Sequence, residues 1–355
     1  MSNLIREEIQ ALSAYHVPPA EDLIKLDAME NPYPLPDEIQ SLWLAVLAKA
    51  EINRYPDPAA QKLSKKIKQV MCVAEKQRII LGNGSDELIQ IMAMAVAKPG
   101  RSILAPEPSF VMYKMIATFV GMNYIGVPLN DDFSLDIEVM LSAIKTHQPS
   151  LIFLAYPNNP SGNCFNESEI ESILNTAEGL VVLDEAYHPF SNHSFMPRLG
   201  EFENLLVMRT VSKMGMAGLR LGMLAGAEKW ITEFDKIRLP YNINVLTQLS
   251  VEFALEHNDV FEQQAQLICQ QREVLLVALA AMDNIQVYPS QANFILIRLL
   301  SADANDVFEC LKKQGILIKN LHPAGALLQQ CLRLTVGTPA QNEACLAALK
   351  ECLSR

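Results

Sequence analysis

Short apolar runs alternate with longer amphipathic segments from about residue 78 onward, and this alternation restricts the possible folds more than any other feature. Short apolar runs fit buried strands, and apolar residues three and four apart predict the helices between them. Strands that alternate with helices build a mostly parallel sheet covered by helices. We therefore predict an α/β fold, with strands at residues 78–81, 102–105, 124–129, 151–156, 180–184, 205–209 and 219–226.

The pattern changes after Pro240, where long helical segments at 243–256 and 259–282 lead into a second, smaller unit. There we predict two strands within 285–299, a helix at 303–315, a strand at 331–337 and a final helix at 339–353. The N-terminal segment is rich in proline, which favours an arm over a packed element. We predict three parts: an N-terminal arm with part of a small domain (1–50), a large mixed-sheet domain (51–242) and a small α+β domain (243–355).

Composition excludes several classes of partner. A net charge of −11, without any run of Lys and Arg, argues against binding to nucleic acid. The longest apolar runs, such as residues 91–97, are far shorter than the ~20 residues that cross a bilayer, and the start MSNLIREEIQ is too polar for a signal peptide. We therefore expect a cytoplasmic protein that binds neither membrane nor nucleic acid.

Cysteine and histidine spacing gives no sign of a metal site. The seven cysteines include no Cys-x-x-Cys pair, and their odd number favours reduced thiols. The six histidines show neither His-x-x-x-His spacing nor a cluster with cysteine, so we predict that no metal is bound.

The segment GNGSDE follows a predicted strand and opens a predicted helix. The backbone N–H groups of Gly84, Ser85 and Asp86, together with the helix dipole, are suited to holding a phosphate. Glu87 stands where a Rossmann fingerprint needs glycine, and no P-loop motif is present. From this stretch alone, an ordinary strand-to-helix turn capped by Ser85 is favoured over a phosphate site.

Two further strands end at residues that carry chemistry. Asp184 ends the run VVLD, with Tyr187 close behind, which places a carboxylate at the carboxyl edge of the sheet, where ligands bind. Lys213 follows the strand at 205–209, and burial beside another cation would make its amine a nucleophile. A helix cap for Asp184 and a surface position for Lys213 are the alternatives.

Taken in order, these segments resemble the histidinol-phosphate aminotransferases, within the fold-type I enzymes that depend on pyridoxal 5′-phosphate. The resemblance covers nearly the whole chain, and the ordered set is far more specific than any of its parts. It is carried by ENPYPLP (30–36), RYPDP (54–58), GNGSDE (82–87), PSFVMY (108–113), YPNNPSG (156–162), DEAY (184–187), TVSK (210–213), GLRLG (218–222) and CLRLTVG (331–337).

The resemblance implies roles around the cofactor ring. Lys213 would bind the cofactor covalently and shuttle a proton, and Asp184 would pair with the ring nitrogen, so that the ring can accept electrons. Tyr187 and Asn159 would hydrogen-bond the ring oxygen. Phe110 would stack on the ring, where many relatives carry tyrosine.

The resemblance also implies a phosphate site and a shared dimer. The cofactor phosphate would lie against Gly84, Ser85 and Asp86, with Thr210, Ser212 and Arg220 completing the site. Tyr55 would reach the cofactor phosphate of the neighbouring subunit in a homodimer.

At the substrate end, Arg333 matches the family arginine that receives a carboxylate or phosphate, and its forked guanidinium suits both. Many relatives place a second arginine about a dozen residues earlier, where this chain has Lys319. Tyr15 is a further candidate for contact with the substrate phosphate.

The expected function is transfer of an amino group between histidinol phosphate and 2-oxoglutarate, giving imidazole-acetol phosphate and glutamate. Two alternatives use the same scaffold: transamination of aromatic amino acids and decarboxylation of a phosphorylated amino acid. A third, of a different class, is a regulator that binds the cofactor without turnover.

Overall fold

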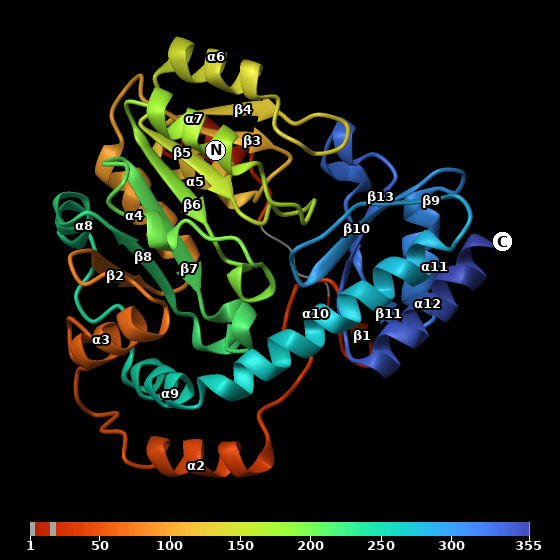
Figure 1. Ribbon diagram of the computed structural model, residues 1–355, viewed down its shortest axis with the longest axis horizontal. Coiled ribbons are helices and arrows are strands. Elements are labelled where there is room, and N and C mark those ends of the chain that lie inside the picture. The colour runs from red at the N-terminus through yellow and green to blue at the C-terminus, as the bar shows by residue number, and fades with distance from the viewer. Residues whose placement is uncertain (1–3, 15–18, 355) are drawn as a thin grey trace.

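A computed structural model of the protein describes residues 4–14 and 19–354. It has two lobes, and the larger one is built on a seven-stranded sheet with the order β2-β8-β7-β6-β5-β3-β4 (Figure 1). The central strands pair in parallel, whereas β8 is antiparallel to both of its neighbours, which gives the predicted mixed sheet. The strands are β2 (Arg78–Gly82), β3 (Ser102–Glu107), β4 (Asn123–Pro128), β5 (Leu151–Ala155), β6 (Leu180–Asp184), β7 (Leu205–Thr210) and β8 (Gly222–Gly226).

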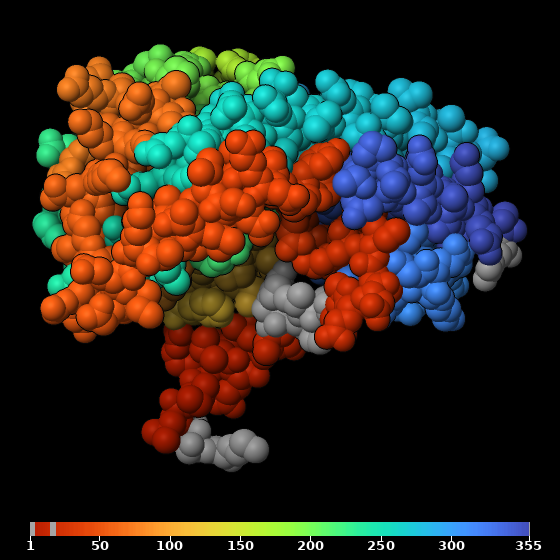
Figure 2. Space-filling view, turned by 90° about the horizontal axis from the view of Figure 1, so that it is seen from below, coloured from red at the N-terminus to blue at the C-terminus, as the bar shows by residue number. Residues whose placement is uncertain are grey.

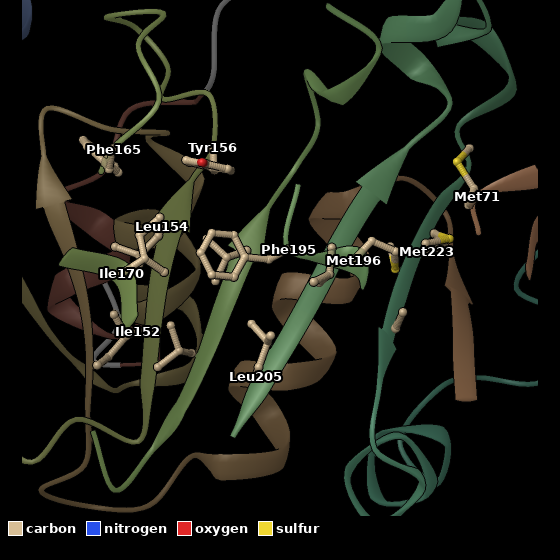
Figure 3. Close-up of a cluster of buried hydrophobic side chains, with 14 of the residues drawn as sticks. Met71, Ile152, Leu154, Tyr156, Phe165, Ile170, Phe195, Met196, Leu205 and Met223 are labelled. Carbon is tan, nitrogen blue, oxygen red and sulfur yellow. The ribbon is translucent and has the colours of Figure 1, made fainter. Parts of the chain in front are cut away.

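Helices cover both faces of this sheet because its strands are apolar on both sides. Along β5, Ile152 and Leu154 pack into one core cluster and Phe153 into the other, as the period of two requires. One face, seen in Figure 3, packs against α3 (Gln61–Val70), α6 (Ile137–His147), α7 (Glu167–Thr176) and α9 (Val245–Glu256). The other packs against α4 (Ser85–Val96), α5 (Met112–Val120) and α8 (Glu228–Asp235).

The smaller lobe contains an antiparallel four-stranded sheet with the order β12-β13-β10-β9. These strands are β9 (Ile285–Val287), β10 (Phe294–Leu299), β12 (Lys319–Asn320) and β13 (Cys331–Thr335). Its helices are α10 (Asn258–Ala280), α11 (Ala304–Lys313) and α12 (Pro339–Leu353), the last with the predicted bounds and a capping box from Thr338. Figure 1 shows α10 running from α9 into this lobe, and its apolar residues belong to both cores.

The N-terminal segment is packed more closely than the prediction of an arm allowed. It contains α1 (Glu7–Gln10), β1 (Ile24–Lys25) and α2 (Asp37–Leu47). The strand β1 pairs in parallel with β11 (Ile316–Leu317) of the smaller lobe, and Leu26 is only 2% exposed. Figure 2 shows the later, orange-red part of this segment lying across one face, against the C-terminal residues, whereas the dark red start that contains α1 projects from the body. Sequence analysis missed this strand because two residues are too short to show a periodic pattern. The prolines around it favoured an arm instead.

The expectation that all cysteines are reduced is wrong for one pair. Cys310 of α11 and Cys352 of α12 form a disulfide, with their Cα atoms 5.9 Å apart. Spacing along the chain could not reveal this pair, because only the packing of the two helices brings the residues together. None of the helices within residues 4–14 and 19–354 has the length and apolar character needed to cross a membrane. The domain boundaries at 50/51 and 242/243 stay predictions.

Candidate active site

A cavity lies where the carboxyl-end loops of the parallel strands meet the N-terminus of α4. Its position matches the crevice in which open α/β sheets bind ligands. Most of the predicted site residues line it: Ser85, Asp86, Phe110, Asn159, Asp184, Tyr187, Thr210, Ser212, Lys213 and Arg220. Met29, Ala155 and Ala186 also line it and were not predicted.

Lys213 presents an amine to the cavity from the short 3₁₀ turn η3 (Ser212–Met214) that follows β7. Its Nζ donates to the carbonyl oxygen of Ala28 at 3.2 Å and lies 5.7 Å from the centre of the Tyr187 ring. Burial, followed by the positive charge of Arg333, lowers the pKa of Lys213 to about 8. A minor but appreciable fraction of this amine is therefore neutral near physiological pH, far more than for a lysine of ordinary pKa, and a nucleophile or proton acceptor must be neutral.

Asp184 ends β6, is 4% exposed and forms another wall of the cavity. Its Oδ2 accepts a hydrogen bond from the Tyr113 hydroxyl at 2.7 Å, and its Oδ1 accepts one from the backbone N–H of Ala186 at 3.2 Å. Burial raises the pKa of Asp184 to about 6, and these two hydrogen bonds oppose the rise. A buried carboxylate of this kind favours a cationic partner.

Asn159 connects the two lobes through its amide. Its Nδ2 donates to the hydroxyl of Tyr187 at 3.1 Å, and its Oδ1 accepts from Nη1 of Arg333 on β13. Arg333 is 6% exposed, donates from Nη2 to the backbone oxygen of Asp27 at 3.0 Å, and lies 5.2 Å from the centre of the Phe294 ring. The two lobes therefore place a guanidinium, an amide and a phenol side by side.

At the opposite end, the N-terminus of α4 meets Arg220. Ser85 and Asp86 begin the helix, where free backbone N–H groups attract anions, and Arg220 pairs with Asp86 at 3.1 Å. Gly84 has φ +82°, and a Cβ there would lie 2.5 Å from Nη2 of Arg220, so only glycine lets the guanidinium approach. The predicted strand at 219–226 begins only at Gly222, because a 3₁₀ turn, η4 (Ala217–Leu219), and a left-handed Arg220 precede it.

Thr210 and Ser212 complete this end of the cavity. Their hydroxyl oxygens lie 2.9 Å apart, and both residues are buried at the end of β7. Together with Arg220 and the helix terminus, they provide the hydrogen-bond donors that a phosphate needs.

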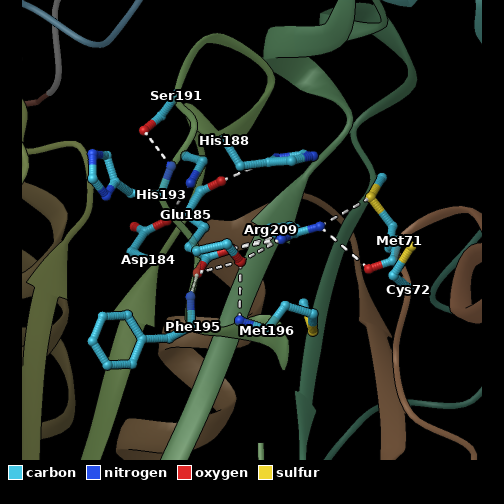
Figure 4. A network of polar contacts seen from close by, with 12 residues as sticks. Met71, Cys72, Asp184, Glu185, His188, Ser191, His193, Phe195, Met196 and Arg209 are labelled. Carbon is cyan, nitrogen blue, oxygen red and sulfur yellow. Dashed lines mark hydrogen bonds and ion pairs between the residues drawn. The ribbon is translucent and has the colours of Figure 1, made fainter. Parts of the chain in front are cut away.

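A buried ion pair lies next to Asp184 along the chain, and sequence analysis did not predict it. Glu185 is fully buried and accepts from Nε of Arg209 at 2.9 Å and from the backbone N–H of Phe195 at 2.6 Å (Figure 4). These contacts connect the segment after β6 to β7. The adjacent side chains of Asp184 and Glu185 point to opposite faces of the sheet. The Glu185–Arg209 ion pair therefore fixes the backbone next to Asp184 from the face opposite its carboxylate.

Among the predicted residues that the structure describes, Gly84, Arg333, Tyr55 and Lys319 do not line the cavity. Tyr55 is 81% exposed and stacks on Tyr241, with ring centres 4.5 Å apart. Lys319 lies directly opposite Arg333 in the β12–β13 pairing, so both side chains project from the same face of the sheet. Tyr15 lies outside the described residues. Within the described ranges, no three His, Cys, Asp or Glu side chains form a group that could hold a metal ion.

Comparison with known proteins identifies close relatives. The family model for aminotransferase class I and II matches residues 21–349. The chain is 54% identical over 346 residues to histidinol-phosphate aminotransferase 2 of Nitrosococcus oceani, with 98% of this chain and 96% of that protein covered. It is 49% identical over 358 residues to histidinol-phosphate aminotransferase 1 of Ralstonia nicotianae, with 99% and 95% covered.

Among solved structures, histidinol-phosphate aminotransferase from Sinorhizobium meliloti in complex with pyridoxal-5′-phosphate superposes with a TM-score of 0.88. The sequence identity is 22%, and the match covers 100% of this chain and 98% of that chain. A match at this sequence identity shows only that the two proteins share a fold. It confirms the predicted α/β architecture.

Proposed function

Since this chain belongs to the class I and II aminotransferase family, we propose that it transfers an amino group between histidinol phosphate and 2-oxoglutarate, a step of histidine biosynthesis. The observation that carries the proposal is the cavity that Lys213, Asp184 and Asn159 line together, with Arg333 hydrogen-bonded to Asn159 behind it. Relatives about half identical over nearly the whole chain are named for this reaction. That similarity favours it over aromatic transamination or decarboxylation.

The residues of the cavity fit pyridoxal phosphate, the cofactor of this family. An aldehyde needs an amine of lowered pKa, which Lys213 offers, and a pyridine nitrogen needs a buried carboxylate, which Asp184 offers. A phosphate needs a helix terminus and a guanidinium, and the absence of a side chain at Gly84 keeps Arg220 beside the terminus of α4. The three chemical features of the cofactor therefore find separate partners in one cavity.

Each residue then has a chemical task. Pyridoxal phosphate, when bound, supplies an electron sink for the carbon that carries the amino group. Lys213 would hold the cofactor through Nζ and, once released, take and return a proton at that nitrogen. Asp184 would keep a proton on the ring nitrogen, and Tyr187 and Asn159 would orient the ring oxygen. Phe110, which lines the cavity, would pack on the ring face.

Arg333 and Lys319 would hold the anionic ends of the substrates. Arg333 is positioned for a carboxylate or phosphate because its guanidinium is buried beside Asn159. Lys319 projects from the same face of the small sheet, which supports a role as a point charge for the phosphate of histidinol phosphate. Tyr15 stays a candidate for the same phosphate.

The substrate is tested by comparing single-turnover half-reactions with histidinol phosphate and with phenylalanine. Purified protein should show the visible band of lysine-bound cofactor, and histidinol phosphate should deplete this band with the higher second-order rate constant. A preference for phenylalanine would overturn the assigned substrate. A band that neither amine changes would instead indicate a cofactor-binding regulator.

Replacing Lys319 with alanine should weaken histidinol phosphate selectively. Loss of one hydrogen bond to a charged group should raise its KM about tenfold while the KM for glutamate stays unchanged. Lys313→Ala, which removes an exposed lysine from α11 of the same lobe, is the matched control. Equal KM changes for both substrates in K319A would contradict a dedicated phosphate contact.

A homodimer and a cytoplasmic location complete the proposal. Tyr55 and Tyr241 form a stacked aromatic pair at the surface, 81% and 41% exposed, which supports a contact with a second copy of the chain. Through that contact Tyr55 would reach the neighbouring cofactor phosphate. Sedimentation velocity of the wild-type protein and of Y55A measures the association directly.

A further inference from the structure

Tyr113 is a fully buried residue of α5 whose hydroxyl reaches the carboxylate of Asp184. The hydroxyl donates to Oδ2 of Asp184 at 2.7 Å. Tyr113 does not line the cavity, whereas Asp184 does. The hydroxyl of Tyr113 can therefore act on a molecule in the cavity through the carboxylate of Asp184.

The ring of Tyr113 is fixed by aromatic neighbours. It stacks on Phe153 of β5 with ring centres 4.7 Å apart and planes 9° apart. It also meets Phe110 edge to face, with ring centres 5.5 Å apart and planes 85° apart. Because these contacts restrict rotation of the side chain, the hydroxyl is already oriented toward Asp184. Forming the hydrogen bond therefore costs little conformational entropy.

The charge of Asp184 needs such a donor. Burial favours its neutral form, and the carboxylates of Asp86 on α4 and of Glu185, directly after β6, act in the same direction. The N–H of Ala186 and the hydroxyl of Tyr113 are the hydrogen-bond donors that oppose them. A protonated carboxyl cannot balance a cationic ring nitrogen, so loss of either donor weakens that pairing.

We propose that Tyr113 is a positioning residue for the reaction: its hydroxyl holds Oδ2 of Asp184, keeping the carboxylate ionised and oriented toward the ring nitrogen of pyridoxal phosphate. The inference rests on the proposed function, since it assigns Asp184 to that nitrogen. Tyr113 is the last residue of PSFVMY, one helical turn beyond Phe110, so one short helix start would supply both the ring stack and the support of the carboxylate.

The test is Tyr113→Phe, which removes one oxygen and keeps the stacked ring. We expect the Kd for pyridoxal phosphate, measured by equilibrium dialysis, to rise about tenfold, as for loss of a hydrogen bond to a charged group. We also expect the pH midpoint of the visible cofactor band to move upward. A ring nitrogen that holds its proton less well withdraws fewer electrons from the bond to Lys213.

Tyr288→Phe is the matched control, because Tyr288 is a buried tyrosine whose hydroxyl has no hydrogen-bond partner among the described residues. It should leave the Kd and the pH midpoint unchanged. In an Asp184→Asn background, Y113F should lose most of its effect on Kd, since the two residues act as one unit. An undiminished effect in that background would show that Tyr113 acts by another route.

A Y113F protein with the Kd and pH midpoint of the wild type would overturn the inference, even if its thermal stability fell. If Y113F does not fold, 3-fluorotyrosine placed at position 113 keeps the ring and strengthens the donor, and the midpoint should then move downward; an unmoved midpoint would count against the inference. A wild-type protein without any cofactor band would instead refute the proposed function, so the two failures are distinct.

Discussion

Replacing Lys213 with alanine should reduce amino-group transfer by about 10³-fold or more, because the variant loses both the nucleophile and the proton carrier. Among the described residues that line the cavity, Lys213 is the only lysine. The measurement is the half-reaction with glutamate at saturating cofactor, together with the visible spectrum. K213A should also lack the band of lysine-bound cofactor.

Two further variants separate the chemistry of Lys213 from its charge and from folding. Lys213→Arg keeps a cation but offers no neutral amine, so it should be as inactive as K213A. Lys236→Ala, an exposed lysine of the same lobe, should leave the rate unchanged. A K213R protein with most of the wild-type rate would show that only the charge matters.

The folded state disfavours the charged form of Lys213, because burial lowers its pKa from 10.5 to about 8. This penalty is present at neutral pH and fades as pH rises through about 8 toward the unfolded value. K213A should therefore unfold in urea at the same or a higher midpoint than wild type at pH 7. Loss of activity would then not be attributable to unfolding.

Replacing Arg333 with glutamine should give the second large effect. We expect kcat/KM to fall roughly 30-fold to 1000-fold for both glutamate and histidinol phosphate, because a buried charged contact to the substrate is lost. This corresponds to a loss of about 2–4 kcal/mol of transition-state stabilisation. Most of the loss should appear in KM, since the guanidinium holds the substrate in both ground and transition states. Steady-state kinetics with each amine donor measures this directly.

Arg298→Gln is the control for Arg333, because Arg298 lies on the neighbouring strand β10 and donates to the backbone oxygen of Leu327 at 2.7 Å. It should alter stability without altering the KM for either amine. Equal kinetic effects of the two variants would mean that Arg333 serves the fold of the small sheet and not the substrate.

The large sheet was predictable because each strand is a short apolar run that ends at a polar residue. That rule alone placed Asp184 and Thr210 at the sheet edge, where the structure has them. Met29 gave no such signal: it lines the cavity because its backbone, at φ +53°, is bound to Thr335 and Asn293, far away in the sequence. Contacts set by tertiary packing leave no local pattern.

Tyr113 and the Glu185–Arg209 pair were missed for a related reason. Each residue lies within or beside a segment that sequence analysis singled out, but burial and pairing depend on which face of the sheet a residue takes. Adjacent carboxylates at 184 and 185 look alike in sequence, whereas one faces the cavity and the other the core. The family resemblance implied roles for the residues that line the cavity. The residues behind them could be found only from the structure.

The pairing of β1 with β11 also bears on how the chain folds. Its paired residues, Ile24 and Ile316, are about 290 positions apart, so the small lobe contains both an early and a late part of the chain. During synthesis the large sheet can assemble first, whereas β1 has no partner until the C-terminal residues emerge. The last step of folding is then the long-range pairing of β1 with β11, which brings Ala28 and Met29 to the cavity.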